Sequence, residues 1–221
     1  MEKRRVAVLI SGRGSNLMAL MQAARRPSYP AEIALVLSNR AQAGGLLAAQ
    51  QNAVPTAVVD HGRYGADRHQ FEAAMQHVLE KARIELVCLA GFMRLLTPSF
   101  VAKWNGRMLN IHPALLPAFK GLDTHARALA AGVKVHGATV HFVAEEMDSG
   151  AIVAQAALAV HEDDSAESLA ARVLNLEHRI YPLALALVAC GRAKLVGGRC
   201  VMAAAERDES VLIAPATELE K

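Results

Sequence analysis

Residues 6–17 read Val-Ala-Val-Leu-Ile-Ser-Gly-Arg-Gly-Ser-Asn-Leu, an unbroken apolar run that ends in a glycine-rich turn. Five consecutive apolar residues predict a strand at residues 6–10 that is buried on both faces, because a half-exposed strand would alternate apolar and polar side chains. Helical periodicity follows the two glycines at residues 16–25. A buried strand joined by a tight turn to a helix is the first half of a βαβ unit. This stretch therefore predicts a parallel sheet covered by helices.

The same order of strand and helix repeats through the first half of the chain. Further strands are predicted at residues 33–38, 56–59, 86–90 and 108–111, and helices at residues 45–51, 66–81 and 99–104. Repeated βα units predict an α/β fold with a doubly wound, mostly parallel sheet, helices on both faces and right-handed crossovers. Ligands of such sheets bind outside the carboxyl ends of the strands, so the residues that follow each strand are the first candidates for a site.

The pattern changes after Gly121, where two neighbouring strands are close enough to pair as a hairpin and so predict an antiparallel addition to the sheet. The predicted elements are a helix at 124–131, the paired strands at 137–143 and 151–160, a long helix at 165–190 and a terminal hairpin of 194–196 and 199–202. No internal repeat or linker interrupts the chain. Residues 1–202 therefore predict a single domain, and residues 203–221 a flexible tail.

The composition bounds the class of protein. The 221 residues are 53% hydrophobic and 20% charged, which predicts a globular protein with a sizeable core. The net charge is only +3 and the basic residues are scattered, so a small anionic substrate fits better than nucleic acid. No apolar stretch is long enough to span a membrane. Three distant cysteines, Cys88, Cys190 and Cys200, predict buried thiols in a reducing cytoplasm.

The glycine-rich turn at residues 11–16 is a candidate phosphate site. Glycines at the start of a helix let backbone N–H groups close around an anion at the positive end of the helix dipole. The motif lacks the third glycine of the dinucleotide pattern and the Gly-Lys-Ser/Thr of a Walker loop, so a monophosphate is predicted. The structural alternative is a plain turn in which Ser15 caps the helix.

Asn110 and His112 stand two positions apart at the end of the last predicted parallel strand. Side chains at i and i+2 of a strand point to the same face, so an amide and an imidazole can act on one atom. Asp148, just before Ser149 and Gly150, adds a carboxylate on a tight loop. An amide donor, an imidazole and a carboxylate are the groups that acyl transfer requires.

These residues also have structural alternatives. His112 could be an imidazole satisfied in the core, and Asp148 could brace a β-turn, as Asp before Ser-Gly often does. His136 and His141 flank the next strand and are interpreted as structural. The nine histidines show no HxxxH or HxH pairing with cysteine or aspartate, so no metal site is predicted.

Five motifs in this order resemble the phosphoribosylglycinamide formyltransferase family: SGRGSNL at 11–17, LAGFMRLL at 89–96, NIHPALLP at 110–117, HGATVHFV at 136–143 and Glu177-His178. The resemblance implies a Rossmann-like formyltransferase fold with a phosphate-binding half near residues 1–105 and a catalytic and folate-binding half near 106–202. It implies transfer of a formyl group from the co-substrate 10-formyltetrahydrofolate to the primary amine of 5′-phosphoribosylglycinamide, in cytoplasmic purine (IMP) biosynthesis, by direct attack through a tetrahedral intermediate.

The resemblance also assigns site residues, and it implies no metal. The catalytic residues are Asn110, His112 and Asp148. The substrate-binding residues are Gly14, Ser15, Asn16, Met93, Pro113 and Glu177. The folate-binding residues are Arg68, Arg94, Leu95, Leu96, Val143, Ala144, Glu145, Glu146 and Met147. One position departs from the family pattern: Leu174 stands where Lys or Gln is expected near the phosphate, and Arg13 and Arg172 are both candidates to compensate for it.

Three other functions compete with this one. Formyltetrahydrofolate deformylase is expected to carry a regulatory domain before the first strand and a second histidine after the motif histidine, where this chain has Pro113. Methionyl-tRNA formyltransferase is expected to carry an additional carboxyl-terminal domain and a different first loop. A sensor of phosphorylated metabolites would need the loop at residues 12–16 but not the catalytic trio. The sequence leaves a homodimer open and predicts neither a nucleic-acid nor a membrane partner.

Overall fold

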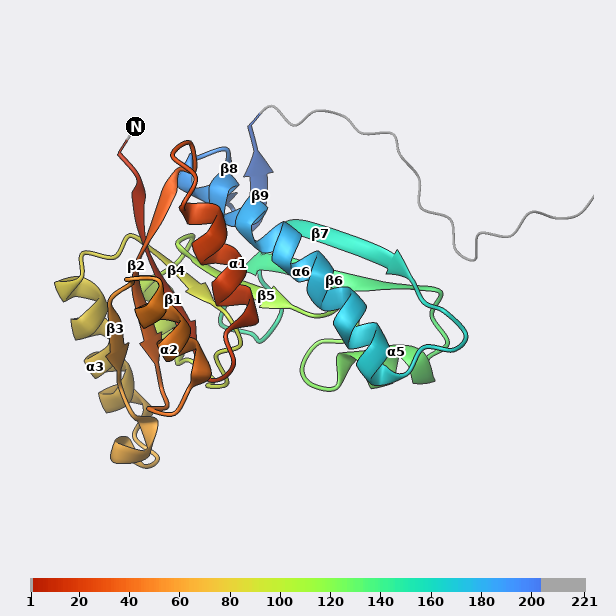
Figure 1. Ribbon diagram of the computed structural model, residues 1–221, viewed down its shortest axis with the longest axis horizontal. Helices are drawn as coiled ribbons and strands as arrows, with labels where there is room; N and C mark the ends of the chain where they lie inside the picture. The colour runs from red at the N-terminus through yellow and green to blue at the C-terminus, as the bar shows by residue number, and fades with distance from the viewer. Residues whose placement is uncertain (1, 204–221) are drawn as a thin grey trace, which may run out of the picture.

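The computed structural model describes residues 2–203 and is built on a sheet of seven strands (Figure 1). The strands are β1 (Arg4–Ile10), β2 (Ala31–Ser38), β3 (Thr56–Val58), β4 (Leu86–Leu89), β5 (Met108–His112), β6 (Val135–Phe142) and β7 (Ile152–Ala159). Their order in space is β3-β2-β1-β4-β5-β6-β7. The first five strands are parallel, whereas β6 is antiparallel to both β5 and β7. The predicted doubly wound sheet with an antiparallel addition is confirmed.

Helices cover both faces of this sheet (Figure 1). They are α1 (Ser15–Ala24), α2 (Gly44–Gln51), α3 (Arg68–Lys81), α4 (Pro98–Lys103), α5 (Thr124–Ala130) and α6 (Ala166–Ala189). Val6, Val8 and Ile10 of β1 belong to a core cluster with residues of α1, α2 and α6. Ala7 and Leu9 belong to a second cluster with residues of α3 and α4. A strand between two helical layers has no solvent face, which explains the unbroken apolar run.

One element was not predicted, and several element boundaries differ from the prediction by one or two residues. A short 3-10 helix, η1 (His61–Tyr64), was not predicted, and α3 begins at Arg68 instead of residue 66. The physical reason is the cap: the Asp67 side chain accepts from the Gln70 backbone N–H, which fixes the first turn at that point. The predicted terminal hairpin is confirmed as β8 (Ala193–Val196) and β9 (Arg199–Met202).

One side chain of the long helix α6 hydrogen-bonds directly to two strands of the sheet. Tyr181 is fully buried, and its hydroxyl lies 2.9 Å from Leu89 O and 3.2 Å from Leu109 O. It therefore ties α6 to both β4 and β5. Glu177, which lies one turn earlier on the same helix, is held over the sheet by this attachment.

The cysteines correct part of the prediction. Cys88 is fully buried and burial raises the pKa of its thiol to about 12, but Cys190 and Cys200 are only half-buried. All three are free thiols. Apart from Ala203, the predicted tail at residues 203–221 lies outside the described residues. Within residues 2–203, no helix combines the length and the apolar character that crossing a membrane demands.

Candidate active site

Asn110 and His112 of β5 converge with a carboxylate from the loop between β6 and β7. The buried His112 ring places Nδ1 at 3.4 Å from Oδ2 of Asp148. The Asn110 Nδ2 lies 3.2 Å from Nε2 of His141, and this Nε2 lies 3.8 Å from Oδ1 of Asp148. The structure thus brings together the three residues expected to form one cluster, and adds a second imidazole to them.

The Asp148 carboxylate reaches this cluster because its loop folds back along the sheet. Val143 N–H donates to Met108 O at the start of β5, whereas Asp148 contacts His112 at the end of that strand. Asp148 has a φ of +53°, a left-handed conformation that aspartate tolerates better than most residues. Its Oδ2 accepts from Gly121 N–H at 2.9 Å. The carboxylate therefore bridges two distant segments and does not brace its own turn, so the structural alternative for Asp148 is wrong.

Both ring nitrogens of His112 face acceptors. Nε2 lies 3.0 Å from the carbonyl oxygen of Phe119, and Nδ1 faces the Asp148 carboxylate. A neutral imidazole has one N–H, whereas the imidazolium has two. Only the imidazolium could donate to both acceptors at once, and it is also the stronger hydrogen-bond donor.

His141 was interpreted as structural, yet it connects the predicted residues. It lies directly opposite Asn110 in the β5–β6 register, and residues opposite each other share a face. Its Nδ1 lies 2.9 Å from Phe142 O and can donate to it, which leaves Nε2 to accept from Asn110 Nδ2. Burial lowers the pKa of His141 below its ordinary value, although Phe142 and Asp148 oppose this shift. A neutral His141 thus fixes the Asn110 amide and leaves its second N–H free to donate elsewhere.

Two further histidines lie behind the site. His136 is fully buried and packs edge-on against His125, with ring centroids 5.3 Å apart, and against Phe119, at 5.8 Å. Burial, together with the neighbouring His125 and His112, lowers the pKa of His136 to about 4. His136 therefore stays neutral near pH 7 and does not compete with a charge on His112.

The free energy of unfolding should fall by about 2 kcal/mol as the pH is lowered below the ordinary pKa of His136. The cause is the proton that the unfolded chain binds and the folded chain does not. Between pH 6.5, its ordinary pKa, and about 4, its value in the fold, the unfolded chain binds this proton and the folded chain does not. Above that window both states are neutral and the effect is absent. Urea unfolding at about pH 7 and about pH 4.5 measures it. His136→Phe should lose less stability on acidification than the wild type, whereas His77→Phe, at an exposed position, should match the wild type. Equal acid losses in all three proteins would contradict the assignment.

The glycine-rich turn leads into α1, and no side chain caps the start of this helix. Gly14 is the N-cap of α1, with a φ of +81° and no side-chain cap, and Ser15 is the first helical residue. The alternative in which Ser15 caps the helix is therefore wrong. A Cβ on Gly14 would lie 2.9 Å from the Gly45 Cα, so the turn packs directly on α2. The uncapped N–H groups of Ser15 and Asn16 are free to bind an anion.

Asn16 and Glu177 form a buried polar pair next to this turn. Asn16 Nδ2 donates to Oε2 of Glu177 at 2.6 Å. Burial raises the pKa of Glu177, while the hydrogen bond from Asn16 opposes that shift. The pair joins α1 to α6 and places a carboxylate beside the glycine-rich turn.

Ser11 and Asn39 are polar residues near the site that sequence reasoning did not single out. The Ser11 hydroxyl donates to Asn39 Oδ1 at 2.6 Å and accepts from the Met93 backbone N–H at 2.8 Å. This buried pair ties the turn after β1 to the loop after β4. Ser11 belongs to the quoted motif, so its position was available from the sequence, but its partners lie in the segments that follow β2 and β4. Met93 is thereby held beside the turn with its side chain 64% exposed.

Most of the predicted folate residues lie in two neighbouring segments, and Arg68 lies apart from them. Leu96 and Val143 pack against the same core cluster, so the segments 94–96 and 143–147 lie on one side of the sheet. Leu95 and Met147 are exposed apolar side chains of these segments. Arg68 begins α3, and no described contact connects it to either segment. Among residues 2–203, no group of three His, Cys, Asp or Glu side chains could hold a metal ion.

The sequence matches a known family over most of the described fold. The family model described as "Formyl transferase" matches residues 4–185. The chain is 52% identical over 193 residues to the trifunctional purine biosynthetic protein adenosine-3 of Gallus gallus, covering 87% of this chain but only 19% of that protein. It is 43% identical to the phosphoribosylglycinamide formyltransferase of Haemophilus influenzae, covering 87% of this chain and 90% of the relative.

A solved structure gives the same result in three dimensions. The glycinamide ribonucleotide transformylase 1 of Symbiobacterium toebii superposes with a TM-score of 0.87 at 44% identity, covering 90% of this chain and 94% of that one. The chain spans about a fifth of the length of the trifunctional relatives and most of the length of the single-function ones. The family model matches residues 4–185, and the chain shares its fold and much of its sequence with these proteins. The chain therefore belongs to the formyl transferase family.

Proposed function

We propose that this chain is a phosphoribosylglycinamide formyltransferase, which transfers the formyl group of 10-formyltetrahydrofolate to the primary amine of 5′-phosphoribosylglycinamide. The observation that carries the proposal is the convergence of Asn110, His112 and Asp148, with His112 Nδ1 at 3.4 Å from the carboxylate. Two of the relatives named above, those from Haemophilus influenzae and Symbiobacterium toebii, carry this activity in their names. The uncapped start of α1 supplies the anion site that a ribose phosphate requires.

The reaction needs no covalent enzyme intermediate. The neutral amine attacks the formyl carbon, a C–N bond forms, and the carbonyl electron pair moves to oxygen. The His112 N–H that faces Phe119 O in this structure and the free N–H of Asn110 are donors for the resulting oxyanion. The oxyanion carries a full negative charge, so it competes for these donors better than a neutral carbonyl does.

Collapse of the tetrahedral intermediate breaks the bond between the formyl carbon and N10 of the folate. The nitrogen that attacked must lose a proton and N10 must gain one. Asp148 lies 9% exposed beside His112 and can accept and return this proton through water. Its negative charge also stabilises the imidazolium during the reaction. Neutral His141 acts through Asn110, by fixing the amide, and is a positioning residue.

The binding roles follow the same arrangement. The backbone of Gly14, Ser15 and Asn16 receives the phosphate, and Glu177 receives the ribose hydroxyls. Met93 and Pro113 pack against the glycinamide end of the substrate. The pterin lies between two segments, and the residues that contact it are Arg94, Leu95, Leu96, Val143, Ala144, Glu145, Glu146 and Met147. Arg68 is assigned to the glutamate tail of the folate.

The proposal extends to the organisation of the protein. Residues 1–202 act as one formyltransferase domain, with a phosphate-binding half at about 1–105 and a catalytic and folate-binding half at about 106–202, in the cytoplasm. Glycinamide ribonucleotide and the formyl folate are its small-molecule partners. No metal takes part in the steps above.

A direct assay tests the function against its competitors. Protein mixed with glycinamide ribonucleotide and 10-formyltetrahydrofolate should convert the folate, followed by its absorbance, only when both compounds are present. Turnover without the ribonucleotide would indicate a deformylase instead. Tight ribonucleotide binding without any turnover would indicate a sensor. Both results would overturn the proposal.

A further inference from the structure

The glycine-rich turn offers only neutral backbone N–H donors at the start of α1. A phosphate ester brings a charge of about −1.5 to −2 near pH 7. The nearest side chains do not offset this charge. Asn16 is buried, its Nδ2 already donates to the Glu177 carboxylate, and its Oδ1 has no hydrogen-bond partner in the described part of the chain. A phosphate bound here would therefore lie near a second acidic group, and a nearby cation would offset their repulsion.

Helix α6 does not supply that cation. Arg172 is engaged elsewhere: its guanidinium donates to Asp164 at 2.5 Å and to Ala159 O at 2.7 Å, and lies 3.1 Å from His161. Leu174 is three residues before Glu177, on the same face of the helix, and is apolar. Of the two candidates that the sequence offered, Arg172 is thus excluded by its own contacts.

His178 follows Glu177 on α6 and supplies no charge either. Burial lowers the pKa of His178 below its ordinary value, so the ring is neutral near pH 7. Arg179, the other arginine of α6, is exposed but lies two positions from Glu177, and side chains at i and i+2 of a helix do not face each other. No basic residue of α6 therefore shares the face of Glu177 beside the turn.

Arg13 stands between the two glycines of the loop itself. Its side chain is exposed and forms no hydrogen bond or ion pair with residues 2–203. Its backbone is close to α2, since a Cβ on Gly44 would lie 3.9 Å from the Arg13 Cα. We propose that the Arg13 guanidinium pairs with the phosphate of the ribonucleotide and supplies the positive charge that the Glu177 face of α6 lacks. The inference rests on the proposed function, because it requires a phosphorylated sugar in the loop.

Guanidinium and phosphate form a strong pair because the planar donor fork matches two phosphate oxygens. Arg13→Gln should therefore raise the Kd for ribose 5-phosphate about 10-fold, the effect of losing one partly exposed charged hydrogen bond. Isothermal titration calorimetry with the full chain measures this. The wild-type Kd should also weaken with added salt more steeply than the variant Kd, since salt screens the lost ion pair.

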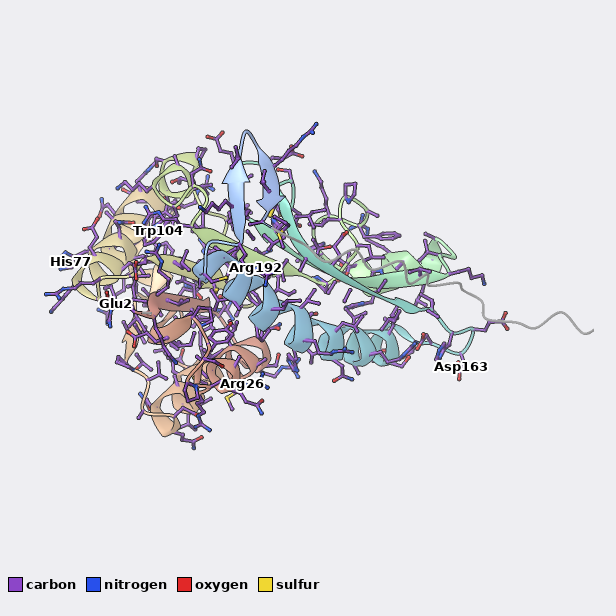
Figure 2. The ribbon with its side chains drawn as sticks, turned by 90° about the horizontal axis from the view of Figure 1, so that it is seen from above. Glu2, Arg26, His77, Trp104, Asp163 and Arg192 are labelled. Carbon is purple, nitrogen blue, oxygen red and sulfur yellow. The ribbon has the colours of Figure 1, made fainter. Side chains whose placement is uncertain are left out.

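Arg26→Gln is the matched control. Arg26 is exposed on the surface at the other end of α1 (Figure 2), and its side chain, like that of Arg13, has no partner in the structure from residue 2 to residue 203. The substitution removes one positive charge far from the turn, so the net charge of the protein changes by the same amount as in Arg13→Gln. The Kd of Arg26→Gln for ribose 5-phosphate should equal that of the wild type.

The outcomes separate the inference from the proposed function. If Arg13→Gln binds ribose 5-phosphate as tightly as the wild type, or if Arg26→Gln weakens binding equally, the Arg13 contact is refuted even when the enzyme turns over normally. If the formyl-transfer assay fails while only Arg13→Gln loses affinity, the contact stands and the assigned reaction does not. A wild-type chain that does not bind ribose 5-phosphate at all refutes the contact.

Discussion

His112→Ala should lower kcat at least about 100-fold while the Kd for glycinamide ribonucleotide stays nearly unchanged. The imidazole lies beside the Asp148 carboxylate at the end of β5, whereas the glycine-rich turn follows β1 and leads into α1. In the proposed mechanism, removing the ring therefore deletes an oxyanion donor without touching the groups assigned to the phosphate. Steady-state kinetics with saturating formyl folate give kcat, and calorimetry with the ribonucleotide gives the Kd.

Because His112 is buried, the variant must first be shown to fold, by circular dichroism and by its urea midpoint. His77→Ala, at an exposed position of α3, is the matched control and should keep wild-type kcat. A folded His112→Ala with wild-type kcat would remove this residue from the mechanism. A large rise in the ribonucleotide Kd with unchanged kcat would make His112 a binding residue instead.

Gly150→Ala should abolish most activity and destabilise the fold by about 3 kcal/mol, the scale of an overpacked buried site. A Cβ at Gly150 would lie 1.7 Å from Phe142 O, 2.8 Å from Phe142 C and 3.2 Å from His141 Nδ1. The first two are backbone atoms, so the end of β6 or the loop must move. Either movement displaces His141 or Asp148, which lie on the two sides of this contact.

Urea unfolding and the formyl-transfer assay, applied to the same preparation, test both effects. Gly44→Ala is the control, because its Cβ would meet only the Arg13 Cα at 3.9 Å, an ordinary van der Waals distance. It should keep wild-type stability and activity. A stable and fully active Gly150→Ala would show that the loop can shift without disturbing the catalytic cluster.

The sequence carried enough information for the sheet and for most of the cluster. The apolar run at Val6–Ile10 predicted a strand buried on both faces, and it packs into two separate cores. The spacing of Asn110 and His112 predicted a shared face because the side-chain period of a strand is fixed at two residues. These features depend on local geometry, which a single chain segment determines.

Other features depend on pairings that no segment specifies alone. The place of His141 opposite Asn110 is set by the β5–β6 register, across a long connection whose path the sequence does not give. The contact between Phe119 O and His112 depends on that same path. The salt bridge that removes Arg172 from the candidates depends on Asp164, which precedes α6. In each case the outcome depends on a contact between segments that are far apart in the sequence, and local propensity does not determine such contacts.

The order of the strands also fixes the distance between the glycine-rich turn and the catalytic cluster. β4 lies between β1 and β5, so the turn after β1 and His112 at the end of β5 are separated by two interstrand spacings, roughly 10 Å. All three strands are held between two helical layers, and this span cannot stretch without breaking backbone hydrogen bonds. On the proposed assignment, a phosphorylated amine that is one sugar long can bind by its phosphate at one end of this span and react at the other. Shorter or longer amines would reach only one of the two ends, so we expect the fixed spacing of the strands to select against them.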